Sequence, residues 1–265
     1  MLIDVHAHIY PENLAQKVTA NLNGHYGVPI AHQGTVAEYL NICRQGNVDA
    51  AIVFTVATKP EQVSPANRWA IINNNKNNLI SFGTLHPDYQ DLDGEINRLK
   101  SAGIKGIKLH PDFQKFYLDD KKAILMYEKL AKDFIILFHV GDDQVPEKTN
   151  YTSPARLANV LDAIPSLKVI AAHMGGYQMW DQAIEYLVGK NLYFDTSSSY
   201  YFLQAEKFRF IIKEHGWDKI LLGSDYPFSD PIREVTGIKK LALSDNEYRA
   251  IIGDNARKLL ADLGL

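Results

Sequence analysis

Two histidines two positions apart open the chain, in Leu2-Ile3-Asp4-Val5-His6-Ala7-His8. Side chains alternate along an extended strand, so His6 and His8 are expected on the same side. Two imidazoles that converge on one point can bind a metal ion or transfer protons. A single His-x-His is weak evidence, because a short strand with polar residues on a wet face produces it by chance. The pair gains weight only if other polar residues must lie beside it.

Other polar residues do follow apolar, β-rich runs further along the chain. They are Lys108 and His110 in residues 106–111, His139 after residues 134–138, His173 after residues 168–172, and Asp225 in residues 223–227. Histidine nitrogens with a carboxylate suit a borderline divalent ion such as zinc, which keeps a position for water in a catalytic site. His6, His8, His139 and Asp225 supply that set. Each alone could instead be a hydrogen-bonded core histidine or a helix-capping aspartate.

The elements that must position these residues alternate regularly along the chain. Eight strands are predicted, over residues 2–6, 50–55, 80–85, 106–110, 134–139, 168–173, 192–196 and 220–223. Amphipathic helices are predicted between and after them, over residues 36–45, 65–75, 92–102, 121–132, 154–164, 178–189, 203–215 and 231–243. Strands that are almost entirely apolar suit a sheet buried on both faces.

Eight strand–helix units in 265 residues predict a single α/β domain over residues 1–265, a (β/α)8 TIM barrel. Residues 244–263 are predicted to add extra C-terminal helices. A doubly wound open sheet is the structural alternative. In a barrel, the C-terminal ends of the strands face the active site, so the polar residues above are predicted to share one rim.

Composition limits the partners of the protein. The net charge is -3 and the pI about 6.3, so no basic field favours nucleic acid. No apolar stretch reaches the roughly 18 residues of a membrane span. Cys43 is the only cysteine, which excludes an internal disulfide and fits a reducing compartment. We therefore expect a cytoplasmic protein that acts on a small-molecule substrate.

Three connecting segments are candidates for substrate specificity. Residues 9–34 are predicted to form a long first loop that carries Tyr10, His25, Tyr26 and His32, and residues 141–153 a second that carries Asp142, Asp143 and Lys148. Residues 197–202 offer hydroxyls and aromatic surface. Loops of such length are often lids or binding elements, although each could be ordinary surface. His86 and His215 are interpreted as structural.

The chain resembles the amidohydrolase superfamily in an ordered series of motifs. These are His6-Ala7-His8, residues 106–111, Phe138-His139, residues 172–176 and residues 223–227. More narrowly it is similar to the amidohydrolase-related branch, which includes aminocarboxymuconate-semialdehyde decarboxylase, and residues 253–260 are similar to the closing helix of that branch. TatD-type nucleases share the first motif, but their strand-four glutamate is absent here.

The resemblance implies roles for these residues. His6, His8 and His139 hold the metal, Asp225 is both ligand and proton shuttle, and His173 orients water or polarises the substrate. His173, if neutral, could also take a proton directly. Zinc lowers the pKa of its water to about 7, which makes hydroxide available at neutral pH. We therefore expect a metal-dependent hydrolase of a small cyclic or carboxylated amide or ester, with Zn²⁺ as the expected ion.

The role of Lys108 and the reaction type stay open at this point. In members with two metals a strand-four lysine is carboxylated and bridges the ions, whereas with one metal Lys108 is free to bind a substrate carboxylate. Pairing of Lys108 with Asp112 is the structural alternative. His110 either shares the substrate role or bonds within the rim. Non-oxidative decarboxylation of an aromatic or muconate-like acid is the alternative reaction, and a binding protein with a structural metal is a third hypothesis. Relatives are often dimers, so a homodimer is also an expectation.

Overall fold

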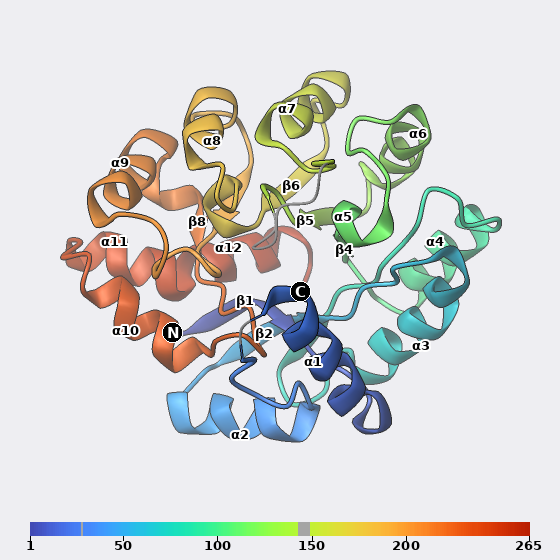
Figure 1. Ribbon diagram of the computed structural model, residues 1–265, viewed down its shortest axis with the longest axis horizontal. Coiled ribbons are helices and arrows are strands. Elements are labelled where there is room, and N and C mark those ends of the chain that lie inside the picture. The colour runs from blue at the N-terminus through green and yellow to red at the C-terminus, as the bar shows by residue number, and fades with distance from the viewer. Residues whose placement is uncertain (28, 143–148) are drawn as a thin grey trace.

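The computed structural model describes residues 1–27, 29–142 and 149–265. Parallel strands form the centre of this part of the molecule. Helices surround these strands (Figure 1). Within those residues the strands are β1 (Ile3–His8), β2 (Ala50–Phe54), β3 (Leu79–Ser81), β4 (Gly106–Leu109), β5 (Ile135–Phe138), β6 (Lys168–Ala171), β7 (Tyr193–Asp195) and β8 (Ile220–Leu221). The eight predicted strands are therefore all present, and each lies within or overlaps its predicted range.

The helices alternate with these strands. The longer ones are α1 (Glu12–Tyr26), α2 (Val36–Gly46), α3 (Val63–Asn73), α4 (Leu92–Ser101), α6 (Lys121–Leu130), α7 (Pro154–Ala163), α8 (Trp180–Tyr186), α9 (Ala205–His215), α10 (Pro231–Lys239) and α12 (Asn255–Asp262). The shorter ones are η1 (Pro60–Gln62), α5 (Pro111–Gln114), η2 (His173–Gly175), η3 (Trp217–Lys219), α11 (Asp245–Arg249) and η4 (Ala250–Asp254). All eight predicted helices are confirmed, as are the extra C-terminal helices. None of the helices in the described residues is both long enough and apolar enough to cross a membrane.

The strands close into a barrel. Sheets β1-β2-β3 and β4-β5-β6-β7-β8 are parallel throughout. They join on one side where the Lys108 amide donates to the Gly83 carbonyl at 2.7 Å, and on the other where the Val5 amide donates to the Leu222 carbonyl at 2.8 Å. The predicted (β/α)8 barrel is confirmed, and the doubly wound open sheet is excluded.

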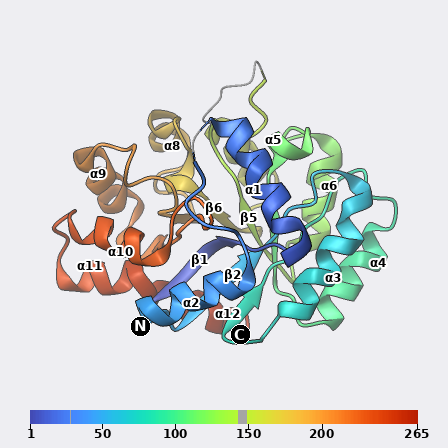
Figure 2. The same ribbon diagram turned by 60° about the horizontal axis from the view of Figure 1, so that its bottom comes forward.

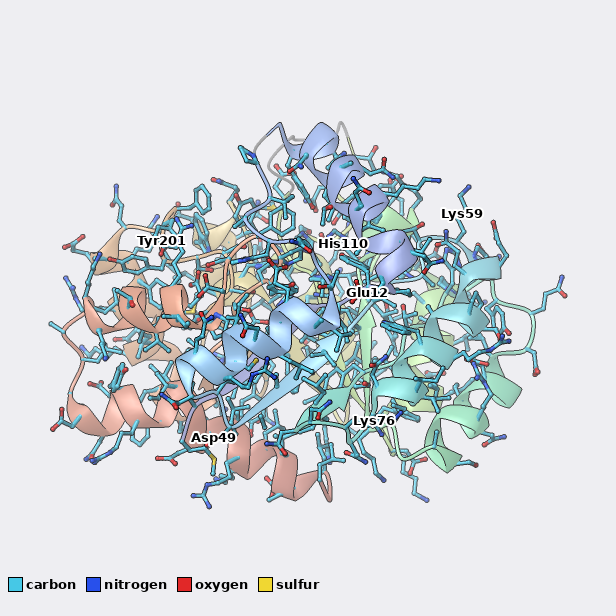
Figure 3. The ribbon with its side chains drawn as sticks, turned by 90° about the horizontal axis from the view of Figure 1, so that it is seen from below. Glu12, Asp49, Lys59, Lys76, His110 and Tyr201 are labelled. Carbon is cyan, nitrogen blue, oxygen red and sulfur yellow. The ribbon has the colours of Figure 1, made fainter. Side chains whose placement is uncertain are left out.

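The two ends of the barrel differ. Interior residues of β5, β6 and β8, such as Leu137, Ile170 and Leu221, form one apolar cluster with Leu259 and Leu260 of α12. Helix α12 therefore covers the N-terminal ends of the strands. Helix α1 lies at the opposite end (Figures 2 and 3). The C-terminal ends of the strands, called the mouth below, are thus left for the polar residues.

The prediction of a long first loop over residues 9–34 is wrong, because most of this segment is helix α1. Only Ala15 and Thr19 of α1 are buried. Leu14, Val18, Leu22 and Tyr26 nevertheless recur at the four-residue spacing of a helix, and the loop prediction overlooked that period. These four side chains face the mouth. The described residues between α1 and α2, 27 and 29–35, contain no strand, and Gly27 ends α1 with a left-handed φ of 65°.

Candidate metal and substrate site

One cavity of about 660 Å³ lies at the mouth of the barrel. Every residue predicted for the site lines it: His6, His8, Lys108, His110, His139, His173 and Asp225. The structure therefore brings together side chains from β1, from β4 and the residue that follows it, and from the segments that follow β5, β6 and β8. Random placement of polar residues would scatter them over the surface.

A bulge in β1 gives His6 its orientation. The pairing of β1 with β2 shifts register between Asp4 and Ala7. Asp4 therefore lies on the outer side of the strand, where it accepts a hydrogen bond from the Tyr39 hydroxyl of α2 at 2.7 Å. His6 and His8 line the cavity, as the two-residue spacing predicts. Alternation alone would have placed Asp4 beside them, and the bulge prevents it.

Asp195, at the end of β7, determines which nitrogen of His6 carries the proton. Its Oδ2 lies 2.9 Å from His6 Nδ1, and a carboxylate at this site can only accept, so Nδ1 is the donor. His6 Nε2 therefore presents a lone pair to the cavity. Burial penalises the Asp195 charge, but His6, His173 and the Ser197 hydroxyl together hold the pKa of Asp195 well below its usual value.

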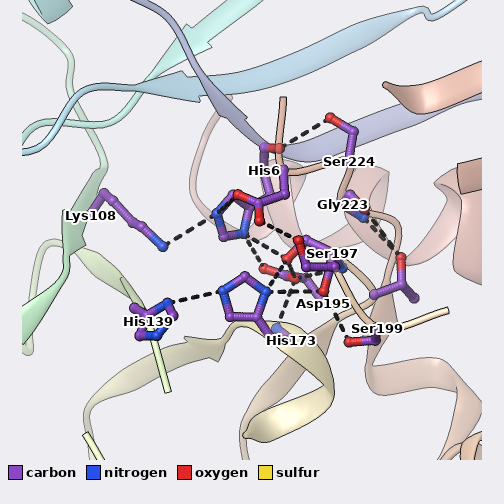
Figure 4. Close-up of polar contacts among 12 residues, drawn as sticks. His6, Lys108, His139, His173, Asp195, Ser197, Ser199, Gly223 and Ser224 are labelled. Atoms are coloured by element: carbon purple, nitrogen blue, oxygen red, sulfur yellow. Dashed lines mark hydrogen bonds and ion pairs between the residues drawn. The ribbon is translucent and has the colours of Figure 1, made fainter. Parts of the chain in front are cut away.

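A second chain of hydrogen bonds orients His173 and His139 (Figure 4). His173 Nδ1 lies 3.0 Å from the Ser197 carbonyl, which can only accept, so this nitrogen is protonated. His173 Nε2 must then accept from His139 Nδ1, 3.0 Å away. It follows that His139 Nε2 carries a lone pair. That atom is buried and has no partner among the described residues.

His6, His8 and Asp225 form a group able to hold a metal ion, with one ligand atom from each residue lying within 4.8 Å of the others. Asp225 Oδ1 is 3.4 Å from His6 Nε2 and 3.6 Å from His8 Nε2. Burial lowers the pKa of His8 well below its usual value, so its ring is neutral and can ligate at pH 7. Three of the four predicted ligands thus converge on one point.

His139, the fourth predicted ligand, belongs to a second group with His110 and Asp112. Its ring stacks on that of His110 at 3.9 Å between centroids. Asp112 accepts hydrogen bonds from the Thr152 hydroxyl and from the Tyr151 amide. The lone pair of His139 Nε2 is nonetheless what a metal ligand needs, and its Nδ1–H bond to His173 is the outer hydrogen bond that ligating histidines usually make. The donor set fits a divalent cation.

Lys108 is a fully buried cation beside these ligands. Its Nζ lies 3.4 Å from His6 Nε2 and 5.2 Å from the centre of the Phe54 ring. Burial lowers the pKa of the Lys108 amine to about 8, although Asp195 and Asp225 oppose that shift. The charged and neutral forms of the amine are therefore closer in free energy than in water.

Two site residues adopt the left-handed backbone region that residues with side chains rarely occupy. His173 has a φ of 60° and Asp225 a φ of 59°. The His173 amide donates to Asp195 Oδ1, and the Asp225 amide donates to the His6 carbonyl at 2.8 Å. Such strained positions cluster at functional sites, where surrounding contacts hold them.

The sequence interpretation missed Asp195, Ser197 and Ser198. Asp195 closes a predicted strand, so the rule that found Asp225 would also have found Asp195. Ser198 donates to Asp225 Oδ2, and Ser197 donates to Asp195 Oδ1. No spacing pattern in the sequence marks these two serines, which lie in the segment 197–202 that the sequence offered only as a candidate for substrate specificity.

The remaining sequence interpretations concern residues outside the ligand set. His86 Nε2 lies 3.1 Å from the Gln114 carbonyl, and His215 Nε2 lies 2.9 Å from the Leu192 carbonyl, which suits their structural interpretation. In the loop 141–153, Asp142 lies beside the mouth and lines a neighbouring cavity. Asp143 and Lys148 lie outside the described residues.

The chain matches the model of a known protein family over nearly its whole length. The family model described as amidohydrolase matches residues 3–261. The chain belongs to the amidohydrolase family. The resemblance seen in its motifs is thereby confirmed. No curated protein matches this amidohydrolase.

Solved structures resemble this amidohydrolase over its full length. A 2,6-dihydroxybenzoate decarboxylase in complex with 2,6-dihydroxybenzoate has a TM-score of 0.76 at 16% identity and covers 100% of this chain and 99% of its own. A 5-carboxyvanillate decarboxylase from Sphingomonas paucimobilis has a TM-score of 0.71 at 16% identity, with coverage of 97% and 98%. A dihydroxybenzoic acid decarboxylase from Polaromonas sp. JS666, with bound manganese and the inhibitor 2-nitroresorcinol, has a TM-score of 0.73 at 15% identity, with coverage of 97% and 96%. At such identities these matches establish the shared fold.

Proposed function

We propose that this amidohydrolase catalyses the metal-dependent, non-oxidative decarboxylation of a hydroxylated aromatic acid or a similar unsaturated acid. The sequence favoured hydrolysis, with decarboxylation as the alternative. The similar solved structures named above are decarboxylases, and one holds manganese, which supports the alternative. Manganese and zinc both suit a site of nitrogen and carboxylate ligands, so the proposal is a single divalent ion of either kind.

The observation that carries the proposal is the burial of Lys108 beside the metal ligands. A buried ammonium needs an anion, because an isolated charge in an apolar interior is costly. Among the described residues Lys108 makes no ion pair, although the charges of Asp195 and Asp225 favour its ammonium form, and its contacts are His6 and the Phe54 ring. A substrate carboxylate or phenolate in the cavity would supply that anion.

The metal would be held by His6, His8 and Asp225, with His139 as the fourth ligand. A divalent cation at this position polarises a substrate oxygen and stabilises charge that develops there. The hydrogen bonds from His6 to Asp195 and from His139 to His173 keep both rings in the tautomer that exposes a ligand nitrogen. His173 thus acts through His139 as a positioning residue.

Asp225 is the residue placed to move the proton. Burial penalises its charge, but the facing His6, His173 and His8 together with the Ser198 hydroxyl lower the pKa of Asp225, so it is ionised at neutral pH. Asp225 accepts the proton of a substrate hydroxyl and returns it to the neighbouring ring carbon that bears the carboxylate. The bond from that carbon to the carboxylate then breaks, its electron pair stays on the ring, and carbon dioxide leaves.

Hydrolysis remains a second candidate because of one specific arrangement. His110, Asp112 and His139 form a second possible ligand group, and Lys108 has a lowered amine pKa of about 8. A neutral amine can react with carbon dioxide to give a carbamate, which would add an anionic bridge between two ions. Two metals would suit the activation of water for attack on an amide or ester.

The experiment that separates the two candidates measures both reactions on metal-loaded protein. Carbon dioxide release is followed with 2-hydroxybenzoate, 2,6-dihydroxybenzoate and a muconate-like acid, and ring opening with small lactones and cyclic amides. We expect carbon dioxide release that falls by about 10²- to 10⁴-fold in Asp225→Asn. Asp181→Asn, at an aspartate whose side chain is 84% exposed, is the matched control. Ring opening without carbon dioxide release would overturn the proposal in favour of hydrolysis.

A further inference from the structure

The cavity at the mouth extends well beyond the metal ligands, along helix α1. Leu14, Val18, Leu22 and Tyr26 all line it, and they are spaced four residues apart. Residues four apart lie on one face of a helix, so α1 presents a continuous apolar stripe to the cavity. Figure 3 shows α1 at the mouth end of the molecule. This stripe is separate from the side of α1 that carries buried Ala15 and Thr19.

The apolar stripe of α1 is only partly covered by protein. Leu14 is 46% exposed, and Val18, Leu22 and Tyr26 are half-buried. Exposed apolar surface in a concave site gains free energy when a ligand covers it. A ligand in the cavity could therefore cover the stripe, whereas Leu125, an exposed leucine of α6, does not line this cavity.

The opposite wall of this part of the cavity is also uncharged. Pro65, Ala66 and Trp69 of α3 line it. Among all the described lining residues, Lys108 is the single lysine or arginine and Asp225 the single carboxylate, and both belong to the metal site. We call the part of the cavity bounded by Leu14, Val18, Leu22, Ala66 and Trp69 the apolar arm. Other polar lining residues, such as Asn21 and Gln62, are uncharged, so a charged substituent there would lose hydration without gaining an oppositely charged partner.

The size of the cavity also exceeds what a simple hydroxybenzoate requires. Its volume of about 660 Å³ lies within the range of sites that hold drug-sized ligands. At about 30 Å³ for each water in the liquid, a single substituted ring leaves room for many more atoms. The residues of the apolar arm line the same cavity as the metal site.

We propose that the substrate carries its acidic group at one end only, next to Lys108, and an uncharged, largely apolar substituent that lies in the apolar arm between α1 and α3. This inference rests on the proposed function for the position of the acidic group. It adds the substrate class: a hydroxy acid with an alkyl or similar apolar tail.

Calorimetric binding to the metal-loaded protein tests the inference without requiring turnover. Three acids are compared: 2-hydroxybenzoate, its 4-butyl derivative and its 4-carboxy derivative, together with 3-butylphenol, which has the tail but no carboxylate. We expect the butyl acid to bind at least about tenfold more tightly than 2-hydroxybenzoate, and the dicarboxylate more weakly.

Two variants locate the binding of the tail. Leu14→Gln should lower the ratio of the affinity for the butyl acid to that for 2-hydroxybenzoate by about fivefold or more. The affinity for 2-hydroxybenzoate itself should stay unchanged. Leu125→Gln, at a leucine that is 51% exposed on α6, should change neither affinity. Retained folding of both variants is checked by their thermal transitions.

The remaining outcomes each decide the matter. Any of three results would overturn the proposed apolar arm. They are equal affinity for the butyl and unsubstituted acids, tighter binding of the dicarboxylate, and the absence of any binding. Binding of 3-butylphenol that depends on Leu14, without binding of 2-hydroxybenzoate, keeps the arm but refutes the carboxylate position. The failure of the proposed function and the failure of this inference are thereby distinguished.

Discussion

Asp195 Oδ2 lies 2.9 Å from His6 Nδ1 and accepts its proton, across 189 residues of sequence. This contact joins β7 to β1 and leaves the lone pair of His6 Nε2 directed at the cavity, where Lys108 Nζ lies 3.4 Å away. Asp195 also accepts from the His173 amide, the Ser197 amide and the Ser197 hydroxyl. One buried carboxylate therefore determines both the tautomer of a proposed metal ligand and the position of the segment after β6 that supports His139.

Replacing Asp195 with asparagine should weaken metal binding. An amide offers one accepting oxygen, so its NH₂ group must face either His6 Nδ1 or the donors at the other oxygen. We expect about 10- to 100-fold lower affinity for the metal, as for outer-shell changes at other sites. Competition against a chelating dye measures it. Asp181→Asn serves as the exposed control, and an unchanged affinity in Asp195→Asn would show that the hydrogen bond does not position His6.

The two possible ligand groups predict different effects of single histidine changes. His8→Ala should remove the bound ion, because His8 belongs to the group with His6 and Asp225, whereas His110→Ala should retain it. Metal content is measured by elemental mass spectrometry on protein purified without a histidine tag or chelator. About one ion per chain, lost only in His8→Ala, is the expected result for a mononuclear site.

About two ions per chain would contradict that result and point to a carboxylated Lys108. In that case His110→Ala should lower the content to about one, because His110 would then be a ligand of the second ion. Loss of all metal in His110→Ala, with His8→Ala unaffected, would place the ion in the other group.

The sequence predicted the barrel and the seven residues of its site because both follow from local rules. Apolar runs of strand length alternate with amphipathic windows, and a polar residue at a strand end must lie at the mouth. The contacts of His139 cannot be predicted by these local rules. Its position at the mouth follows from the sequence, but its hydrogen bond to His173 and its stacking on His110 depend on contacts between strands.

Helix α1 and the β1 bulge show two further limits. The apolar residues of α1 recur every four positions, so the helix is marked in the sequence, but the sequence does not show that this apolar face lines a cavity. The bulge that turns Asp4 away from His6 is set by the pairing of β1 with β2 and by Tyr39 of α2. Neither partner is adjacent in the sequence, so alternation along β1 could not reveal the bulge.

Lys108→Met should weaken the binding of an anionic substrate. The loss of one charge-assisted contact corresponds to about tenfold to a hundredfold in affinity for 2-hydroxybenzoate. Lys108→Arg should not restore it, because the larger planar guanidinium has no room between His6 and Phe54. Inhibitor titration measures both variants, and Lys129→Met, at a surface lysine paired with Asp93, is the control.

The same lysine predicts a pH dependence of anion binding. The pKa of Lys108 is lowered to about 8, so the amine is charged below pH 8 and neutral above it. Affinity for 2-hydroxybenzoate should therefore be retained below pH 8 and fall as the pH rises through that value. The Lys108→Met protein should lack this step. A step of equal size in both proteins would assign the titration to another group.

Glu234 provides a separate prediction about stability. It is fully buried on α10, its Oε1 accepts a hydrogen bond from the Ser229 hydroxyl at 2.6 Å, and its Oε2 is without a partner among the described residues. Burial raises the pKa of Glu234 from 4.5 to about 8. Its neutral form is therefore favoured in the folded protein. Glu234→Gln keeps the accepting oxygen and the shape of the side chain but cannot ionise.

The sign of the effect follows from proton linkage. The pKa of Glu234 is higher in the folded protein than in the unfolded chain, so its contribution to stability is complete below about pH 4.5 and is lost as the pH rises to about 8. The free energy of unfolding of the wild type should fall relative to Glu234→Gln by up to about 1.4 kcal/mol per pH unit across that window. Urea unfolding between pH 4 and 9 measures the difference. Glu206→Gln, at a glutamate whose side chain is 80% exposed, should follow the wild type. Parallel pH profiles for the wild type and Glu234→Gln would mean that the folded protein holds Glu234 ionised, and a cation would then have to be sought beside it.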